Sequence, residues 1–242
     1  MLYILFSPSE GKKFYHTSTQ LKLTGGIALR QEIVHNYNNI IKEGDINTLK
    51  NLFGLKKEEE VYKYAQDIFT APTAKAIERY DGVAYDYLDY NSLSEDAQTY
   101  LHSHLLIFSN LFGVVRADDE IPIYKVKQGN AIGDIKPELY YKKQLKDFLD
   151  NYLHNTQILD LRAGYYDKFY QIPQPYTTLK FLKNGKVVSH WAKAYRGIVL
   201  RACAQANISS LEEFHKLEIE YLQVEDIKKI KNKTQITFSI LE

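Results

Sequence analysis

The feature that most constrains the fold is a short apolar run near the start of the chain. Leu2–Phe6 is hydrophobic at every position and stops at Ser7-Pro8. A strand without a polar face is buried on both faces, so other elements must cover it from both sides. The run therefore predicts a strand inside a layered fold, rather than a strand with one face in water.

Signals for helices and strands alternate along the rest of the chain. Caps and apolar periodicity predict helices over residues 28–42, 45–52, 57–69, 72–81, 94–104, 137–153 and 191–206, and one after the capping box at Ser210. Further strands are predicted over residues 83–85, 121–127, 158–161, 177–183, 187–190 and 236–240. No linker, repeat or low-complexity stretch divides the 242 residues. We expect one mixed α/β (α+β) domain over residues 1–242, with a mixed sheet surrounded by helices.

The overall charge limits how the chain can bind a polyanion. The 31 Lys and Arg nearly balance the 30 Asp and Glu, which leaves a formal net charge of +1. A protein that held nucleic acid over its whole surface would be far more basic. Any anion-binding charge must therefore be gathered in one place.

Composition also indicates a compartment. The only cysteine, Cys203, excludes an internal disulfide and suits a reducing environment. No apolar run approaches the roughly 18 residues needed to span a bilayer, and the start of the chain lacks the basic region of a signal peptide. We expect a cytoplasmic protein with no membrane association and no obligate protein partner.

One long stretch of the sequence is free of acids. Between Lys168 and Leu211 there is no Asp or Glu, whereas the average composition would place about five in 44 residues. The stretch carries seven cations: Lys168, Lys180, Lys183, Lys186, Lys193, Arg196 and Arg201. A solvated surface tolerates both signs of charge, but an anion-binding surface does not. The stretch therefore favours an anion site, with phosphate as the expected anion.

The predicted helix after residue 190 concentrates this charge. On a helical projection His190, Lys193, Arg196 and Arg201 share an outer arc that also contains Gly197 and Leu200, whereas Cys203 falls toward the inner side. Trp191, Tyr195, Ile198, Val199 and Ala202 fall opposite the arc. A merely solvated basic face is the alternative for this helix taken alone.

Two further segments follow predicted strands, where open α/β sheets place their ligands. Arg162 comes directly after residues 158–161, and nearby tyrosines offer rings for base stacking or for the core. In residues 7–13, SPSEGKK, backbone amides and Lys12 offer a phosphate cradle, although the P-loop spacing is absent. Glu10 is unusual in such a cradle and is either a base, a partner of a buried Arg, or simply exposed.

Residues 49–69 resemble a helix-hairpin-helix, which binds nucleic-acid backbones through amides at a helix N-terminus. Gly54 supplies the only glycine, and Glu58, Glu59 and Glu60 follow it. The alternative is a pair of packed helices whose acids favour the helix dipole. The seven His are scattered without a cysteine partner, so we expect no metal site and no cofactor.

Four segments, in order and in spacing, resemble the YaaA family of bacterial peroxide stress proteins. They are Leu5-Phe6-Ser7-Pro8-Ser9-Glu10-Gly11-Lys12, Leu111-Phe112-Gly113-Val114-Val115-Arg116, Asp160-Leu161-Arg162-Ala163-Gly164-x-Tyr166 and Ser189-His190-x-x-Lys193-x-x-Arg196-Gly197-x-x-x-Arg201. The resemblance implies one α/β domain with a positively charged cleft, double-stranded DNA binding and a role in limiting oxidative DNA damage. It also implies a helix-hairpin-helix at residues 45–69.

We therefore expect a DNA-binding protein of the peroxide response that contacts phosphates with little regard to sequence. Lys56 and the amides near Gly54 would hold one stretch of backbone. The cleft would be lined by Arg116, Lys125, Arg162, Lys168, Lys193, Arg196 and Arg201, with Lys12 in the cradle. The rival is an enzyme acting on a phosphorylated small molecule or a nucleotide, with Ser7, Glu10 and His190 as candidate acid–base groups. A closed pocket with Glu10 beside Arg162 or Lys193 would favour the enzyme, and a long open groove would favour DNA.

Overall fold

A large mixed sheet forms the centre of the protein. The computed structural model describes residues 1–188 and 190–241, with His190 described through its backbone alone. The eight strands are β1 (Leu2–Phe6), β5 (Leu105–Ser109), β6 (Gly113–Arg116), β8 (Gln157–Asp160), β9 (Tyr176–Lys183), β10 (Lys186–Val187), β11 (Leu222–Ile230) and β12 (Lys233–Ile240). Their order is β11-β12-β9-β8-β1-β5-β6, with β10 beside β9. The expected mixed α/β fold is confirmed.

The strand β1 lies inside this sheet, as its apolar sequence predicted. It pairs in parallel with β5 on one side and with β8 on the other. All five of its residues are buried, because helices and loops cover both faces of the sheet here. Each fully buried side chain of this kind contributes roughly 1.5–3 kcal/mol, so β1 anchors the core. The strands β9 and β12 continue the parallel run, and β6, β10 and β11 are antiparallel.

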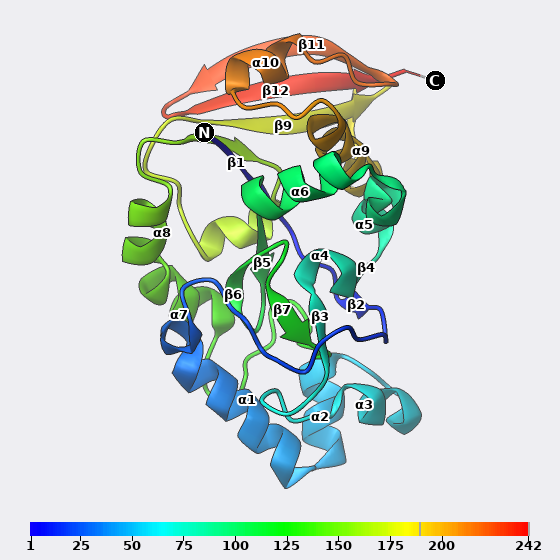
Figure 1. Cartoon of the computed structure of the whole chain (residues 1–242), viewed down its shortest axis with the longest axis vertical. Coiled ribbons are helices and arrows are strands. Elements are labelled where there is room, and N and C mark those ends of the chain that lie inside the picture. Colours follow the sequence, from blue (N-terminus) through cyan, green and yellow to red (C-terminus); the bar gives the residue numbers. More distant parts are fainter. Residues whose placement is uncertain (189, 242) are drawn as a thin grey trace.

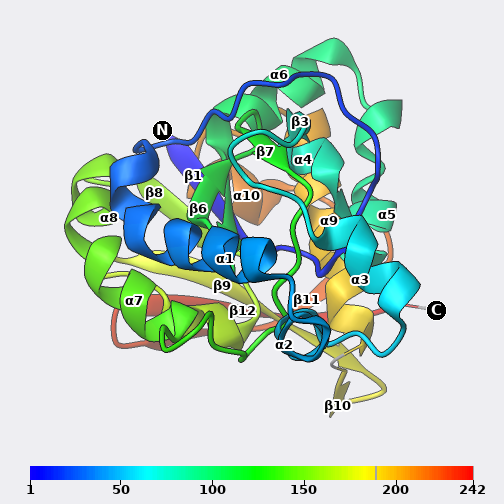
Figure 2. The ribbon, with the colours of Figure 1, turned by 90° about the horizontal axis from the view of Figure 1, so that it is seen from below.

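Helices and short loops pack around the sheet except at β11, which lies exposed at the top edge of the molecule (Figure 1). The α-helices are α1 (Gln31–Glu43), α2 (Ile46–Phe53), α3 (Glu58–Tyr64), α4 (Ala76–Arg79), α5 (Val83–Leu88), α6 (Glu95–His104), α7 (Pro137–Gln144), α8 (Lys146–Tyr152), α9 (His190–Gln205) and α10 (Leu211–Lys216). Short 3-10 helices are η1 (Ile27–Arg30), η2 (Tyr90–Ser92) and η3 (Gly164–Lys168), and β2 (Gly11–Lys12) with β4 (Tyr80–Asp81) and β3 (Thr73–Lys75) with β7 (Glu120–Pro122) form two small ladders. Figures 1 and 2 show α7 and α8 on one side of the molecule and α5 and α9 on the other.

The predicted helix starts are confirmed where a capping side chain was visible in the sequence. The side chain of Asp45 accepts a hydrogen bond from the amide of Thr48 at 2.8 Å, and that of Ser94 accepts one from Ala97 at 3.3 Å. The Ser210 hydroxyl accepts a hydrogen bond from the Glu213 amide at 3.2 Å. Each cap satisfies an amide that the helix itself leaves free, which is why these short polar residues mark the starts.

Other predicted elements were wrong. Residues 72–81 form β3, the single turn α4 and β4 rather than one helix, and residues 83–85 belong to the helix α5 rather than to a strand. The segment 137–153 breaks into α7 and α8 at Leu145, and α3 ends at Tyr64. The strand predicted over residues 121–127 overlaps β7 only at residues 121 and 122. In these segments tertiary packing decides between helix and strand, because their apolar runs are too short for a clear period.

The contact between α5 and α9 sets the position of the basic helix. A Cβ atom added to Gly197 would overlap the carbonyl oxygen of Ala84, so the two helices approach more closely than any larger residue permits. Leu200 is fully buried, whereas Trp191 is 45% exposed. The expectation that Gly197 and Leu200 lie on an outer arc was therefore wrong, because α5 packs against that side of α9. The predicted burial of Cys203 is confirmed.

Across the described residues, no helix is long and apolar enough to cross a membrane.

Candidate anion-binding pocket

A pocket of about 420 Å³ lies where β1 and β8 end. Its lining comes from four places in the chain: the loop after β1, the start of α5, the segment after β8, and α9, with Gln128 closing one side. The carboxyl ends of β1 and β8 meet here because the two strands are parallel neighbours. Of the residues singled out in the sequence, Ser7, Glu10, Lys193 and Arg196 are brought together in this pocket.

Ser7 follows β1 and is hydrogen-bonded to the segment that follows β8. Its hydroxyl oxygen accepts a hydrogen bond from the amide of Ala163 at 2.7 Å, and its carbonyl oxygen accepts one from the Tyr85 hydroxyl at 2.9 Å. Burial raises the pKa of Tyr85 well above its ordinary value, so this hydroxyl stays a donor. The side chain of His190, the third candidate acid–base group, lies outside the described part of the structure.

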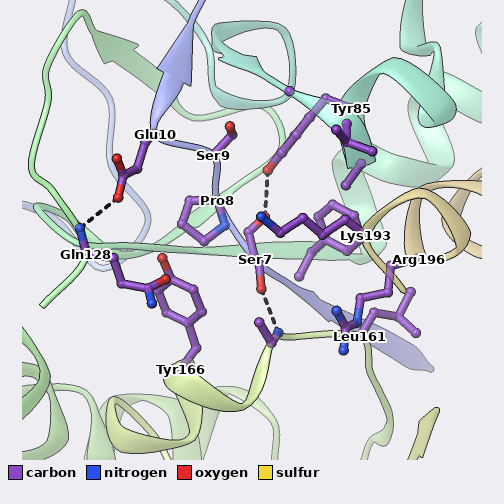
Figure 3. A pocket seen from close by; sticks show the side chains of 15 residues that line it. Ser7, Pro8, Ser9, Glu10, Tyr85, Gln128, Leu161, Tyr166, Lys193 and Arg196 are labelled. Carbon is purple, nitrogen blue, oxygen red and sulfur yellow. Dashed lines mark hydrogen bonds between the residues drawn. The ribbon is translucent and has the colours of Figure 1, made fainter. Parts of the chain in front are cut away.

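Glu10 presents a partly exposed carboxylate on the side of the pocket opposite α9 (Figure 3). Its Oε1 atom accepts a hydrogen bond from the amide of Gln128 at 2.8 Å, and its Oε2 atom lies 3.9 Å from the Nζ atom of Lys125. In Figure 3, Lys193 and Arg196 reach in from α9 on the other side, with Ser7 and Pro8 between. The pocket thus has a cationic side and a carboxylate side.

The side chains of Lys12 and Lys125 are hydrogen-bonded to carbonyl oxygens of the loop after β1 instead of facing solvent. The Nζ atom of Lys12 donates to the carbonyl oxygens of Ser9 at 2.7 Å and Glu10 at 3.2 Å, and it lies 4.4 Å from the ring centre of Tyr124. Lys125 donates to the Glu10 carbonyl at 3.3 Å. Burial lowers the pKa of both lysines, that of Lys12 far below its ordinary value. Both side chains are buried, so in this structure neither ammonium is exposed toward the DNA phosphates that the sequence assigned to it.

Arg162 is also buried and fully engaged. Its guanidinium makes two hydrogen bonds with the Asp160 carboxylate, at 2.8 and 2.9 Å, and donates to the carbonyls of Tyr166 and Tyr170. Burial alone would lower the pKa of Arg162, but the Asp160 carboxylate outweighs it and raises that pKa. Leu161 and Ala163 line the pocket, while the Arg162 side chain is 1% exposed. Arg162 therefore shapes the pocket wall and has no surface to offer a phosphate.

Lys193 and Arg196 differ from these cations because no group in the described part of the chain neutralises them. Within the described residues, neither side chain forms a hydrogen bond, and neither has a carboxylate within 4.0 Å. Lys193 is exposed, and Arg196 is half-buried at the pocket wall. Burial lowers the pKa of Arg196, and only the more distant Asp160 opposes this. A partly desolvated guanidinium that has no counter-ion among the described residues makes this wall of the pocket a candidate for anion binding.

The remaining predicted contacts lie outside the pocket. Arg201 donates to the carbonyls of Leu88 and Asp89, at 2.8 and 3.0 Å, and so caps the end of α5. Arg116, on the edge strand β6, is paired with Asp118 at 2.9 Å. Lys168 is exposed and lies 5.2 Å from the ring centre of Tyr165. Arg116 and Arg201, which the sequence placed in one cleft with Lys193 and Arg196, do not line this pocket, and each contacts neighbouring acceptors instead.

The segment predicted to be a helix-hairpin-helix contains α2, a turn and α3. Gly54 caps the C-terminal end of α2 with φ 66° and lies against the side chain of Lys127, and Lys56 is exposed in the turn. The amide of Lys127 donates to the carbonyl of Leu52 at 2.9 Å, next to Gln128 of the pocket. The hairpin is therefore a neighbour of the pocket.

Sequence reasoning missed Gln128 and the start of α5. Asp81-Gly82 was interpreted as the end of a helix, but Gly82 (φ 143°) precedes α5, and a Cβ atom there would lie 2.6 Å from the Ser9 hydroxyl oxygen. A glycine just before a segment with aromatic residues was the available signal for a close backbone approach. In the described residues, no group of three or more His, Cys, Asp or Glu is arranged to hold a metal ion.

Comparison with known proteins gives the relationships of the chain. It is 43% identical over 235 residues to an uncharacterized protein of Campylobacter jejuni, an alignment that covers 93% of this chain and 96% of that protein. It is 28% identical to a UPF0246 protein of Fusobacterium nucleatum, over 90% and 91% of the two chains, and 29% identical to one of Streptomyces coelicolor, over 83% and 82%. The family model described as peroxide stress protein YaaA matches residues 1–227. The chain therefore belongs to the YaaA family of peroxide stress proteins, as its four motifs predicted.

Proposed function

We propose that the protein acts in the bacterial cytoplasm, in the peroxide stress response, by holding double-stranded DNA through its phosphates. The observation that carries this proposal is the uncompensated charge of the acid-free stretch. Of its seven cations, within the described residues, only Arg201 has a carboxylate within 4.0 Å, that of Asp89 at 3.9 Å. A surface that keeps cations without partners is suited to an external polyanion.

The contacts would centre on α9. Lys193 and Arg196 offer charge at the pocket, and Lys168 offers an exposed ammonium on η3. The turn between α2 and α3, with Lys56 and the amides near Gly54, would hold a second stretch of backbone. These groups contact phosphates rather than base edges, so binding would depend steeply on salt and little on sequence.

A salt titration of duplex binding tests the proposal. With about six phosphates contacted, the slope of log affinity against log salt should be roughly −5. Arg196→Glu should weaken binding more than about tenfold, because it removes one attraction and adds one repulsion. Lys229→Glu, an equal charge change on the exposed edge strand β11, should change affinity less than about twofold. A slope near zero, or equal losses in the two variants, would contradict the proposal.

A second function is favoured by one observation, the presence of Glu10, Ser7 and Lys193 in one pocket. That arrangement suits an enzyme acting on a phosphorylated small molecule or a nucleotide, with Ser7, Glu10 and His190 as the acid–base candidates. Glu10→Gln separates the two functions. Under DNA binding alone, duplex affinity and the peroxide survival of cells carrying the variant should be unchanged, or affinity slightly higher. Normal duplex affinity with lost survival would support the enzyme and count against DNA binding as the whole function.

A further inference from the structure

We propose that the pocket binds one nucleoside monophosphate unit, with its phosphate between Lys193 and Arg196 and its base edge at Glu10. This inference deepens the proposed function and rests on it, since it adds recognition of a single nucleotide to the holding of a DNA backbone. It starts from the two-sided charge of the pocket, in which cations of α9 face a carboxylate across Ser7 and Pro8 (Figure 3). A ligand that satisfies both sides must carry an anion at one end and hydrogen-bond donors at the other.

The cationic side fits a phosphate monoester. Lys193 and Arg196 stand one turn apart on α9, and no described carboxylate neutralises either of them. Arg196 is half-buried, so its charge is poorly solvated and gains more from an anion than an exposed arginine would. A monoester carries close to two negative charges at neutral pH and matches two cations. Glu10 would repel the phosphate, and this fixes which end of the ligand lies against α9.

The carboxylate side fits the donor-rich edge of a base. The Gln128 amide and the neighbouring Lys125 ammonium hold the Glu10 carboxylate in place, and its side chain remains 44% exposed. A carboxylate only accepts hydrogen bonds, so it favours bases whose Watson–Crick edge presents N–H groups. Guanine offers two adjacent donors there. Thymine offers one donor flanked by two carbonyl oxygens, which the carboxylate repels.

The size and walls of the pocket agree with this ligand. About 420 Å³ lies within the range of small-molecule sites, roughly 300–1,000 Å³. Phe6, Pro8, Leu161 and Tyr166 contribute apolar or aromatic surface between the two charged sides. Such surface suits a sugar and a planar base. A free nucleotide and an unpaired, terminally phosphorylated nucleotide of a strand both carry such a monoester and share this chemistry.

Isothermal titration calorimetry at low salt tests the pocket directly. We expect dGMP to bind at least about tenfold more tightly than deoxyguanosine, which lacks the phosphate, and more tightly than dTMP. Lys193→Gln with Arg196→Gln should weaken dGMP at least tenfold, and Glu10→Gln should remove the preference for dGMP over dTMP. Lys229→Gln, on β11 outside the pocket, should bind dGMP like the original chain. Thermal melts would establish that each variant is folded.

Two DNA probes then separate the sources of the nucleotide. One is a duplex closed by loops at both ends, and the other carries an unpaired, 5′-phosphorylated guanine. If the strand is the source, the second probe should displace dGMP and bind at least tenfold more tightly than the first. If the nucleotide is free, dGMP should bind, and the two probes should bind alike and displace it equally, because both would use the same two cations. Either result supports the inference.

Failure of this inference is distinguishable from failure of the proposed function. Equal binding of dGMP and deoxyguanosine, a preference for dTMP, or no binding of dGMP at millimolar concentration by the folded protein would overturn the nucleotide pocket. Salt-dependent binding of the closed duplex would still support DNA holding in that case. Conversely, dGMP binding without any duplex binding would overturn DNA holding and leave the nucleotide pocket standing.

Discussion

The α9 side of the pocket and the α2–α3 hairpin were both predicted to hold phosphates, yet the structure compensates their charges differently. In the hairpin, Lys50 is paired with Glu58 at 2.9 Å, and α3 begins with Glu58, Glu59 and Glu60. Beside the pocket, the acid-free stretch leaves Lys193 and Arg196 without a described acid within 4.0 Å. The lesson is that a local excess of cations indicates an anion site only where folding brings no acid to meet it.

Matched charge reversals in α9 and in the turn between α2 and α3 should show the largest difference between the two regions. Lys193→Glu with Arg196→Glu should weaken duplex binding by about a hundredfold, and Lys56→Glu with Lys57→Glu by less than about tenfold. Both pairs change the net charge equally, and each pair replaces two cations of its own region. Fluorescence anisotropy at one fixed salt concentration would measure the affinities of the original chain and of the two double variants. Equal losses, or a larger loss in the hairpin pair, would move the main contact to the hairpin.

Two glycines near the site offer a stability test of how α9 is positioned. Gly197→Ala should lower stability by about 2 kcal/mol, because the new methyl group overlaps the Ala84 carbonyl oxygen. For a chain of this size that is a drop in Tm of roughly 4–8 °C. Gly164→Ala should stay within about 0.5 kcal/mol, since the nearest atom to its added Cβ, an oxygen of Asp167, is 4.0 Å away. Similar melting temperatures for the two variants would mean that α5 and α9 separate easily.

The smallest effect should come from the inner face of α9. Burial raises the pKa of the Cys203 thiol far above its ordinary value, so the thiol stays protonated, and unreactive, at pH 8. Cys203→Ala should leave duplex affinity within about twofold, and a thiol reagent should label the native chain only after unfolding. Rapid labelling of the folded protein at pH 8 would show that the inner face of α9 opens to solvent.

Local signals were enough to predict much of the framework. The apolar run of β1 and the caps at Asp45, Ser94 and Ser210 are short-range features, and each predicted its element correctly. The strand β5 was missed because α6 passes directly into it at Leu105 without a turn residue. The helix α5 was mistaken for a strand because its identity depends on packing against Gly197, which lies more than 100 positions along the chain.

The candidate site also has residues that local sequence predicted correctly and residues whose surroundings depend on the fold. Ser7, Glu10, Lys193 and Arg196 were predicted from their places after strands or in an acid-free stretch, and they share one pocket. Lys12 and Arg162 follow the same strands but are buried, one under the rings of Tyr80 and Tyr124 and the other against Asp160. The sequence shows directly which positions carry a cation. Whether that cation is free depends on partners that the fold brings to it.

The position of β1 has a consequence for how the chain is made. During synthesis its apolar residues emerge well before their partners, which start at Leu105 in β5 and at Gln157 in β8. Until the ribosome has delivered both, the most hydrophobic strand of the sheet has an unpaired backbone and an exposed surface. Such late, non-local pairing slows folding and lengthens the time in which nascent chains associate with one another. The yield of folded protein should therefore depend on chaperones that shield residues 2–6 while the rest of the sheet is still being translated.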